Sequence, residues 1–215
     1  MIKTAFSHVT DWVFDLDHTL YPPTNTLFSQ IEEKMNSYVM SHLNVDTRHA
    51  SALRDHYWQF YGTTLAGLMR EHDIDPVPFL DQVHDIDFSV LRENAPLREA
   101  ISALPGRKII YTNGTAPYAE KVLDALGLTQ EFSDLYGVEH AQFLPKPERK
   151  AFEVVFDLAK IAPHTAAMFE DSVANLRVPS QMGLKTVLVH TQGADADKHI
   201  DFQTDDLTNF LRQIV

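Results

Sequence analysis

Two aspartates, Asp15 and Asp17, stand directly after the apolar residues 12–14 near the start of the chain. Trp, Val and Phe favour β-structure, so this segment predicts a buried strand that delivers both carboxylates where it ends. If the extended conformation persists through Leu16, the two carboxylates point the same way, because side chains alternate along a strand. Carboxylates at that spacing repel each other unless a cation or a proton lies nearby. The pair indicates a hard-metal site or an acid/base couple, although aspartates are also common in turns.

Two further polar clusters also directly follow apolar segments, and one lysine stands at a predicted helix start. Thr112 and Asn113 directly follow one apolar segment, and Glu170 and Asp171 directly follow another. Because the carboxyl ends of parallel strands lie at one edge of a sheet, we expect these residues to meet the first pair there. Lys146 stands between two prolines at a predicted helix start, where free backbone N–H groups also attract anions.

Together these residues offer carboxylates for a divalent cation, a hydroxyl and an amide for oxygen atoms, and one ammonium group. This set suits phosphoryl transfer, because a metal ion and an ammonium group neutralise the charge that moves as a P–O bond breaks. Each residue also has a purely structural interpretation. The acidic and amide side chains could be turn residues or helix caps, and most lysines lie on the solvated surface.

The elements that position these residues follow from apolar periodicity and from turn signals. A region from about residue 25 to residue 92 has helical spacing and no convincing strand. Its expected helices cover about 25–43, 47–61 and 65–72, with a short helical segment after Pro76. From Pro96 onward, helices alternate with short apolar segments that are typical of strands, and Thr204 is a candidate cap for a last helix. The expected strands are residues 12–14, 108–111, 135–137, 167–169 and 185–189.

Strands that alternate with helices favour an α/β fold with a Rossmann-like, doubly wound, mainly parallel sheet. We expect residues 1–22 and 93–215 to form this α/β core domain, and residues 23–92 to form an inserted helical cap subdomain. The stretch 193–198 is predicted to be a loose loop.

Length and composition restrict the class of protein. The 215 residues suffice for one large domain with an insertion, and no apolar segment approaches the roughly 20 residues of a membrane span. A net charge of −12 opposes general binding to nucleic acids or to anionic membranes.

The absence of cysteine excludes disulfides, thiolate catalysis and Cys-ligated zinc. The first eight residues lack the long apolar core of a signal peptide, so we expect a cytoplasmic protein. The substrate is expected to be a small molecule. The oligomeric state is left open.

Four of these polar segments form a recognisable series. In chain order they are Asp15-Leu16-Asp17-His18-Thr19-Leu20, Tyr111-Thr112-Asn113-Gly114, Lys146-Pro147 and Glu170-Asp171-Ser172. In their order, over nearly the whole chain, they resemble the four motifs of the haloacid dehalogenase-like hydrolases. The resemblance implies that Asp15 is a nucleophile and Asp17 a general acid/base. It also implies that Mg²⁺ binds to Asp15, to the backbone carbonyl of Asp17 and to Asp171.

The resemblance gives the other residues their expected roles. Thr112, Asn113 and Lys146 would bind the phosphoryl group, and Thr112 and Lys146 would also assist catalysis. His18 lies within the first motif and would contact the substrate or have a local structural role. Many members of the family carry another aspartate after the acidic motif, but position 175 is Asn175. Glu170 or Asn175 would therefore support the metal ligands rather than add a fourth carboxylate.

Three shorter stretches narrow the resemblance to the pyrimidine 5′-nucleotidase branch. They are Asp17-His18-Thr19-Leu20-Tyr21-Pro22, Tyr61-Gly62-Thr63-Thr64-Leu65-Ala66-Gly67-Leu68 and Val83-His84. The expected reaction is the Mg²⁺-dependent removal of phosphate from a pyrimidine nucleoside monophosphate, such as UMP or CMP, through a phospho-aspartate. The alternatives are a phosphatase for another small metabolite, such as a sugar phosphate or phosphoglycolate, and a non-catalytic ligand-binding or regulatory protein. Dehalogenation is disfavoured, because on the family pattern it lacks the second aspartate that Asp17 supplies.

Overall fold

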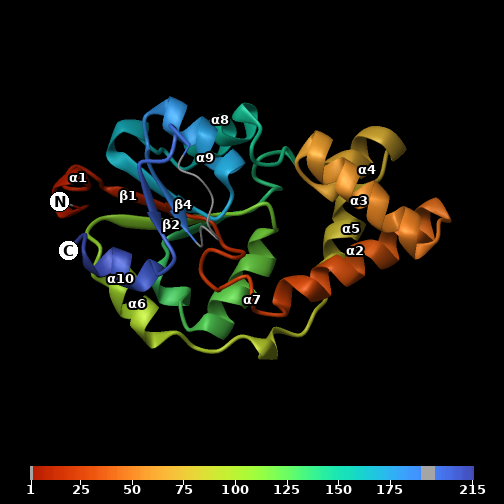
Figure 1. Cartoon of the computed structure of the whole chain (residues 1–215), viewed down its shortest axis with the longest axis horizontal. Coiled ribbons are helices and arrows are strands. Elements are labelled where there is room, and N and C mark those ends of the chain that lie inside the picture. Colours follow the sequence, from red (N-terminus) through yellow and green to blue (C-terminus); the bar gives the residue numbers. More distant parts are fainter. Residues whose placement is uncertain (1, 190–196) are drawn as a thin grey trace.

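A computed structural model describes residues 2–189 and 197–215 of the chain. Its centre is a sheet of six parallel strands in the order β3-β2-β1-β4-β5-β6 (Figure 1). The strands are β1 (Asp11–Phe14), β2 (Arg107–Tyr111), β3 (Asp134–Tyr136), β4 (Ala166–Glu170), β5 (Lys185–Val189) and β6 (Phe202–Thr204). The predicted α/β fold with a doubly wound parallel sheet is therefore confirmed.

Strand β1 lies in the middle of the sheet and pairs with β2 on one side and β4 on the other. Val13 is in register with Ile109 and with Met168. The chain winds from β1 through β2 to β3 on one side and continues from β4 through β5 to β6 on the other. The order of strands thus reverses next to β1, and ligands of doubly wound folds bind at such reversal points, beyond the carboxyl ends of the strands.

Helices cover both faces of the sheet because residues of β1 are apolar on both sides. Trp12 and Phe14 pack in the cluster formed with α6 (Ala95–Ser102), α7 (Ala116–Leu126) and α10 (Leu207–Arg212). Val13 packs in the cluster formed with α8 (Arg149–Leu158) and α9 (Val173–Met182) on the opposite face. The rings of Phe14 and Phe169 stack at 4.6 Å between centroids, which ties β1 to β4.

A helical cap region, α2–α5, follows β1 and lies at one end of the molecule's long axis, whereas both termini lie at the other end (Figure 1). Its helices are α2 (Leu27–Leu43), α3 (Thr47–Tyr61), α4 (Thr64–His72) and α5 (Pro76–Val83). Asp46, Thr63 and Asp75 cap α3, α4 and α5 by accepting hydrogen bonds from backbone N–H groups of the first turns. The division of the chain at residues 22/23 and 92/93 stays a prediction.

Several local details differ from the sequence-based expectations. A short helix, α1 (Ile2–Ala5), precedes β1 and was not among the elements expected from the sequence. Thr204 is the last residue of β6 and does not cap α10; Asp206 does, by accepting a hydrogen bond from the Asn209 N–H at 2.9 Å. Strand β6 was missed because it is only three residues long and has no buried residue. Residues 193–196 of the predicted loose loop lie outside the described residues. No helix in the described part of the chain is long and apolar enough to cross a membrane.

Candidate active site

The predicted polar clusters meet at the carboxyl edge of the sheet. Asp15 directly follows β1, Thr112 directly follows β2, and Glu170 is the last residue of β4. The backbone N–H of Asp15 donates to the carbonyl of Phe169 at 2.9 Å, so the pairing of β1 with β4 continues to Asp15. Lys146 joins these residues from the connection between β3 and α8.

The ammonium group of Lys146 is the centre of this arrangement. It is buried and donates hydrogen bonds to Oδ1 of Asp15 at 2.7 Å and to Oε2 of Glu170 at 2.8 Å. Its third N–H donates to the carbonyl of Tyr111 at 3.0 Å, so all three donors are used. Burial lowers the pKa of Lys146, but the negative charges of Asp15 and Glu170 outweigh this effect and raise the pKa above its ordinary value. Lys146 is therefore a fixed positive charge.

Asn113 and the cap region hold the backbone of Lys146. The amide Nδ2 of Asn113 donates to the Lys146 carbonyl at 3.1 Å, and Oδ1 accepts from the Lys146 N–H at 2.8 Å. Gly62, at the end of α3, has φ +85°, and a Cβ there would lie 3.3 Å from the Lys146 carbonyl oxygen. Helix α8 begins only at Arg149, so Lys146 precedes the helix and its N–H is not free to bind an anion. That part of the sequence-based expectation was wrong.

Three carboxylates lie close enough to share a cation. Asp15, Glu170 and Asp171 each place one oxygen within 4.8 Å of the others. Burial raises the pKa of Asp15; the nearby Glu170 raises it further, while Lys146 lowers it. Burial also raises the pKa of Asp171, and Glu170 and Asp15 add to the effect. Three carboxylates face a single ammonium group, and a divalent cation with oxygen ligands fits such a cluster. Both Glu170 oxygens already accept hydrogen bonds, from Lys146 and from the Ser172 N–H at 3.1 Å.

Asp17 has a different set of partners from Asp15. A turn begins at Asp17, where the Leu20 N–H donates to the Leu16 carbonyl at 3.0 Å as in a helical turn. Oδ1 of Asp17 accepts from the hydroxyl of Tyr21 at 2.5 Å and from that of Tyr118 at 2.6 Å. Burial raises the pKa of Asp17, and these two hydrogen bonds lower it in part.

The remaining predicted residues lie around this centre. Oγ1 of Thr112 is buried and accepts from the Gly114 N–H at 2.9 Å, which leaves its hydroxyl proton free to be donated. Nδ1 of His18 lies 3.7 Å from Oδ2 of Asp171, and burial lowers the pKa of His18. Asn175 is half-buried in the first turn of α9.

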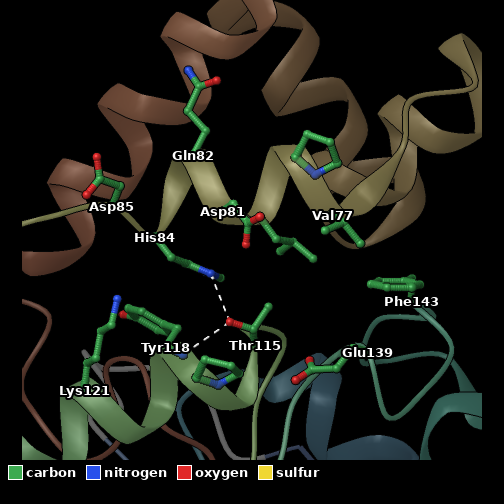
Figure 2. Close-up of a pocket in the computed structure, with 13 residues that line it drawn as sticks. Val77, Asp81, Gln82, His84, Asp85, Thr115, Tyr118, Lys121, Glu139 and Phe143 are labelled. Carbon is green, nitrogen blue, oxygen red and sulfur yellow. Dashed lines mark hydrogen bonds between the residues drawn. The ribbon is translucent and has the colours of Figure 1, made fainter.

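A cleft of about 700 Å³ adjoins the site between α5 and the start of α7 (Figure 2). Tyr118 lines this cleft and also binds Asp17, whereas neither Asp15 nor Lys146 is among the described residues that line it. Its walls include the apolar residues Val77, Leu80, Pro117 and Phe143, and its charged residues are Asp81, Asp85, Lys121 and Glu139.

Sequence reasoning missed four side chains that complete the site. Oγ1 of Thr19 donates to Oδ2 of Asp15 at 3.0 Å, and its place within the first motif could have indicated this contact. Tyr21 stands four residues after Asp17, which is the spacing of a helical turn. Tyr118 gave no signal, because its position on α7 is that of any core residue. His84 was part of the Val83-His84 stretch, but its contact with Tyr118 could not be predicted because it exists only in the folded structure.

Comparison with known proteins defines the class. A family model described as haloacid dehalogenase-like hydrolase matches residues 12–183. The chain therefore belongs to the haloacid dehalogenase-like hydrolases, which confirms the predicted superfamily. The narrower resemblance to the pyrimidine 5′-nucleotidase branch stays a prediction.

The individual proteins that resemble the chain have low sequence identity to it. Phosphate metabolism protein 8 of Saccharomyces cerevisiae is 24% identical over 192 residues, which cover 81% of this chain but only 60% of that protein. Among solved structures, 2-haloacid dehalogenase from Pseudomonas syringae pv. Tomato matches 96% of this chain and 100% of its own with a TM-score of 0.61 and 19% identity. The HAD-hydrolase YfnB from Bacillus subtilis, bound to magnesium, matches 96% of this chain and 98% of its own, with a TM-score of 0.59 and 15% identity. At such identities the structural matches show the fold alone.

Proposed function

We propose that the chain is a Mg²⁺-dependent phosphomonoesterase that acts through a phosphorylated Asp15. The observation that carries this proposal is the placement of Lys146 between Asp15 and Glu170, next to the third carboxylate of Asp171. A fixed ammonium beside a carboxylate cluster that a divalent cation fits suits an anionic phosphoryl group, whose charge must be neutralised while it moves.

The proposed reaction has two steps. A carboxylate oxygen of Asp15 attacks phosphorus, the P–O bond to the leaving group breaks, and Asp17 gives its proton to the departing oxygen. Water then attacks the phosphorus of the phospho-aspartate, Asp17 takes a proton from that water, and phosphate and free Asp15 are released. When bound, Mg²⁺ would neutralise charge on the phosphoryl oxygens; Asp15, Asp171 and the Asp17 carbonyl would hold it. Lys146 supplies positive charge on the Asp15 side, and Thr112 can donate its hydroxyl proton to a phosphoryl oxygen.

Asp17 favours phosphate transfer over dehalogenation. A halide departs without a proton, whereas an alkoxide needs one from an acid within hydrogen-bond reach. Two tyrosine hydroxyls fix the Asp17 carboxyl group, an arrangement that halide displacement does not require. The same consideration opposes a non-catalytic protein, because ligand binding alone does not require a separately held acid beside a buried Asp15–Lys146 pair.

For the substrate, we propose a pyrimidine nucleoside monophosphate. Support comes from the cap stretches at residues 61–68 and 83–84, and from the cleft between α5 and α7, whose volume of about 700 Å³ is large enough for a nucleoside. Among the described residues, three acidic side chains and one lysine line that cleft, so it suits a neutral leaving group. A second anionic group, such as the carboxylate of phosphoglycolate, would be repelled there.

Two assays test the proposal in order. Hydrolysis of p-nitrophenyl phosphate should require Mg²⁺, stop with EDTA and return when Mg²⁺ is added back. A panel of UMP, CMP, AMP, GMP, a sugar phosphate and phosphoglycolate should then give the highest kcat/KM for UMP or CMP. Turnover that survives exhaustive chelation would contradict the metal-dependent mechanism. Equal kcat/KM for UMP and AMP, or a preference for the sugar phosphate, would remove the pyrimidine proposal and leave the phosphatase proposal standing.

A further inference from the structure

Two tyrosines from distant parts of the chain converge on one oxygen of Asp17. Tyr21 follows Asp17 by four residues, whereas Tyr118 lies on α7, and their hydroxyls donate to Oδ1 at 2.5 and 2.6 Å. An oxygen that already accepts two hydrogen bonds is the less basic of the two, so a proton on this carboxyl group resides on Oδ2. The pair therefore fixes both the rotation of the carboxyl group and the oxygen that exchanges a proton.

The ring of Tyr118 is in turn held by residues that follow the cap helices. His84, directly after α5, stacks on it with 4.3 Å between ring centroids and an angle of 12°. Nδ1 of His84 shares a hydrogen bond of 3.3 Å with Oγ1 of Thr115, as Figure 2 shows. Phe88 packs on the same Tyr118 ring at 6.0 Å. Burial, with a smaller effect from Lys121, lowers the pKa of His84 to about 4, so the imidazole that faces Tyr118 is neutral near pH 7.

We propose that Tyr118 is a positioning residue for Asp17 and that His84, by stacking on Tyr118, makes this positioning depend on the contact between the cap region and α7. The inference rests on the proposed role of Asp17 as general acid. It adds that the Tyr118 hydroxyl orients the Asp17 carboxyl group. It also adds that the stack of His84 on Tyr118 connects this group to the cap region. The alternative is that Tyr118 and His84 have a purely structural role and only pack between α5 and α7.

Leaving groups of different basicity separate the two interpretations. p-Nitrophenolate departs without a proton, whereas an alkoxide must receive one, so only the second reaction depends on a well-placed acid. Tyr118 and His84 also line the cleft proposed for the nucleoside, so the alkyl substrate should be too small to fill it. The ratio of kcat/KM for methyl phosphate to kcat/KM for p-nitrophenyl phosphate therefore measures the acid and not the cleft. kcat/KM is the appropriate constant because it reports the first phosphoryl transfer, before Asp17 acts as a base on water.

The main variant is Tyr118→Phe, which keeps the ring and its stack and removes the hydroxyl. We expect this ratio to fall by about tenfold or more, because the loss is greater for the leaving group that needs a proton than for p-nitrophenolate. Tyr21→Phe removes the other donor to the same oxygen and should lower the ratio in the same direction. This second variant keeps the inference testable if Tyr118→Phe does not fold, which thermal unfolding will show.

The chain offers a matched control for the stack. Tyr38 is buried and stacks on His42 at 3.7 Å and 10°, but in the cap region and away from Asp17. Tyr38→Phe should leave the ratio within about twofold of the wild type. His84→Ala should lower the ratio as Tyr118→Phe does, His84→Phe should restore it by restoring the stack, and His42→Ala should leave it unchanged.

The outcomes separate this inference from the proposed function. A wild-type protein that hydrolyses neither substrate overturns the proposed function and the inference with it. A Tyr118→Phe or Tyr21→Phe protein in which both kcat/KM values fall together, or neither falls, overturns the inference and leaves the phosphatase intact. A His84→Ala protein with an unchanged ratio overturns the link to the cap region.

Discussion

Nζ of Lys146 lies 2.7 Å from Oδ1 of Asp15, and both groups are nearly excluded from water, with residue exposures of 1% and 6%. A buried ion pair contributes little net stability, because removing two charges from water offsets most of their attraction. Removing one partner is different, since the other charge is then left buried and uncompensated. The Lys146–Asp15 pair is thus better explained as machinery for an anionic substrate than as a device for stability.

The first prediction concerns this pair. Lys146→Met leaves Asp15 and Glu170 buried without their counter-ion, so the free energy of unfolding should fall by about 3–5 kcal/mol at neutral pH, and activity should be lost. Urea unfolding of the metal-free protein measures the change. The triple variant Lys146→Met/Asp15→Asn/Glu170→Gln removes all three charges and should recover most of the lost stability. A triple variant as unstable as the sum of its single variants would show that the three charges do not interact as described.

A second prediction concerns Asp171. Its raised pKa means that the folded state binds a proton more readily than the unfolded state, so its contribution to stability is present at low pH and is lost as pH rises towards its raised pKa. Because this pKa is about 10, folding at pH 7 requires Asp171 to take up a proton that the unfolded chain has released, so Asp171→Asn should stabilise the metal-free protein. The same variant should lose the rise in Tm that Mg²⁺ gives the wild type.

Thermal unfolding with and without Mg²⁺ tests this prediction. Asp55→Asn on an exposed position of α3 is the matched control and should change neither the metal-free Tm nor the Mg²⁺ effect. An Asp171→Asn protein that is less stable than the wild type and responds fully to Mg²⁺ would argue against a metal site at this residue.

The sequence predicted the parts of this site that depend on strand ends. Asp15, Thr112 and Glu170 meet because parallel strands place their carboxyl ends at one edge, which follows from element order alone. The partners of Asp17 could not be predicted in this way. Tyr118 contacts Asp17 across 101 positions of sequence, and its spacing on α7 is that of a core residue. The prediction that Lys146 stands at a helix start was wrong, because hydrogen bonds with Asn113 hold its backbone before α8 begins at Arg149.

A third prediction concerns the pH dependence of stability. The pKa of His84 is lowered to about 4 in the folded protein, against about 6.5 for an unperturbed histidine. Between these values the unfolded chain takes up a proton that the folded protein does not, so stability falls as pH falls from about 6.5 to about 4. The shift corresponds to a loss of about 3 kcal/mol across that interval.

Urea unfolding at about pH 7 and at about pH 4.5 measures this loss. The His84→Phe protein keeps an aromatic ring but cannot take up a proton, so it should lose less stability between the two pH values than the wild type. His8→Phe, at an exposed position, should behave as the wild type does. Equal losses in the wild type and in His84→Phe would show that His84 does not resist protonation in the folded state.

A fourth prediction separates backbone strain from the support of Lys146. Gly62 and Gly127 both end helices with positive φ, at +85° and +69°, so alanine at either position should cost about 1 kcal/mol of stability. Of the two, only Gly62 would place the new Cβ against the Lys146 carbonyl oxygen, at 3.3 Å, and against Cδ of Pro147, at 3.2 Å. Gly62→Ala should therefore also lower kcat for p-nitrophenyl phosphate, whereas Gly127→Ala should not. Unchanged kcat in Gly62→Ala would mean that the cap region does not support Lys146 through this contact.

The central claim is that Asp15 carries the phosphoryl group, and the Asp17→Asn protein tests it most directly. With p-nitrophenyl phosphate, formation of the phospho-aspartate needs no acid, whereas its hydrolysis needs Asp17 as a base, so the intermediate should accumulate in this variant. Acid quenching followed by peptide mass spectrometry should show the mass of one phosphoryl group on the peptide that contains Asp15, and not in Asp15→Asn/Asp17→Asn. Release of p-nitrophenolate by Asp17→Asn with no phosphoryl group on Asp15 would contradict the account.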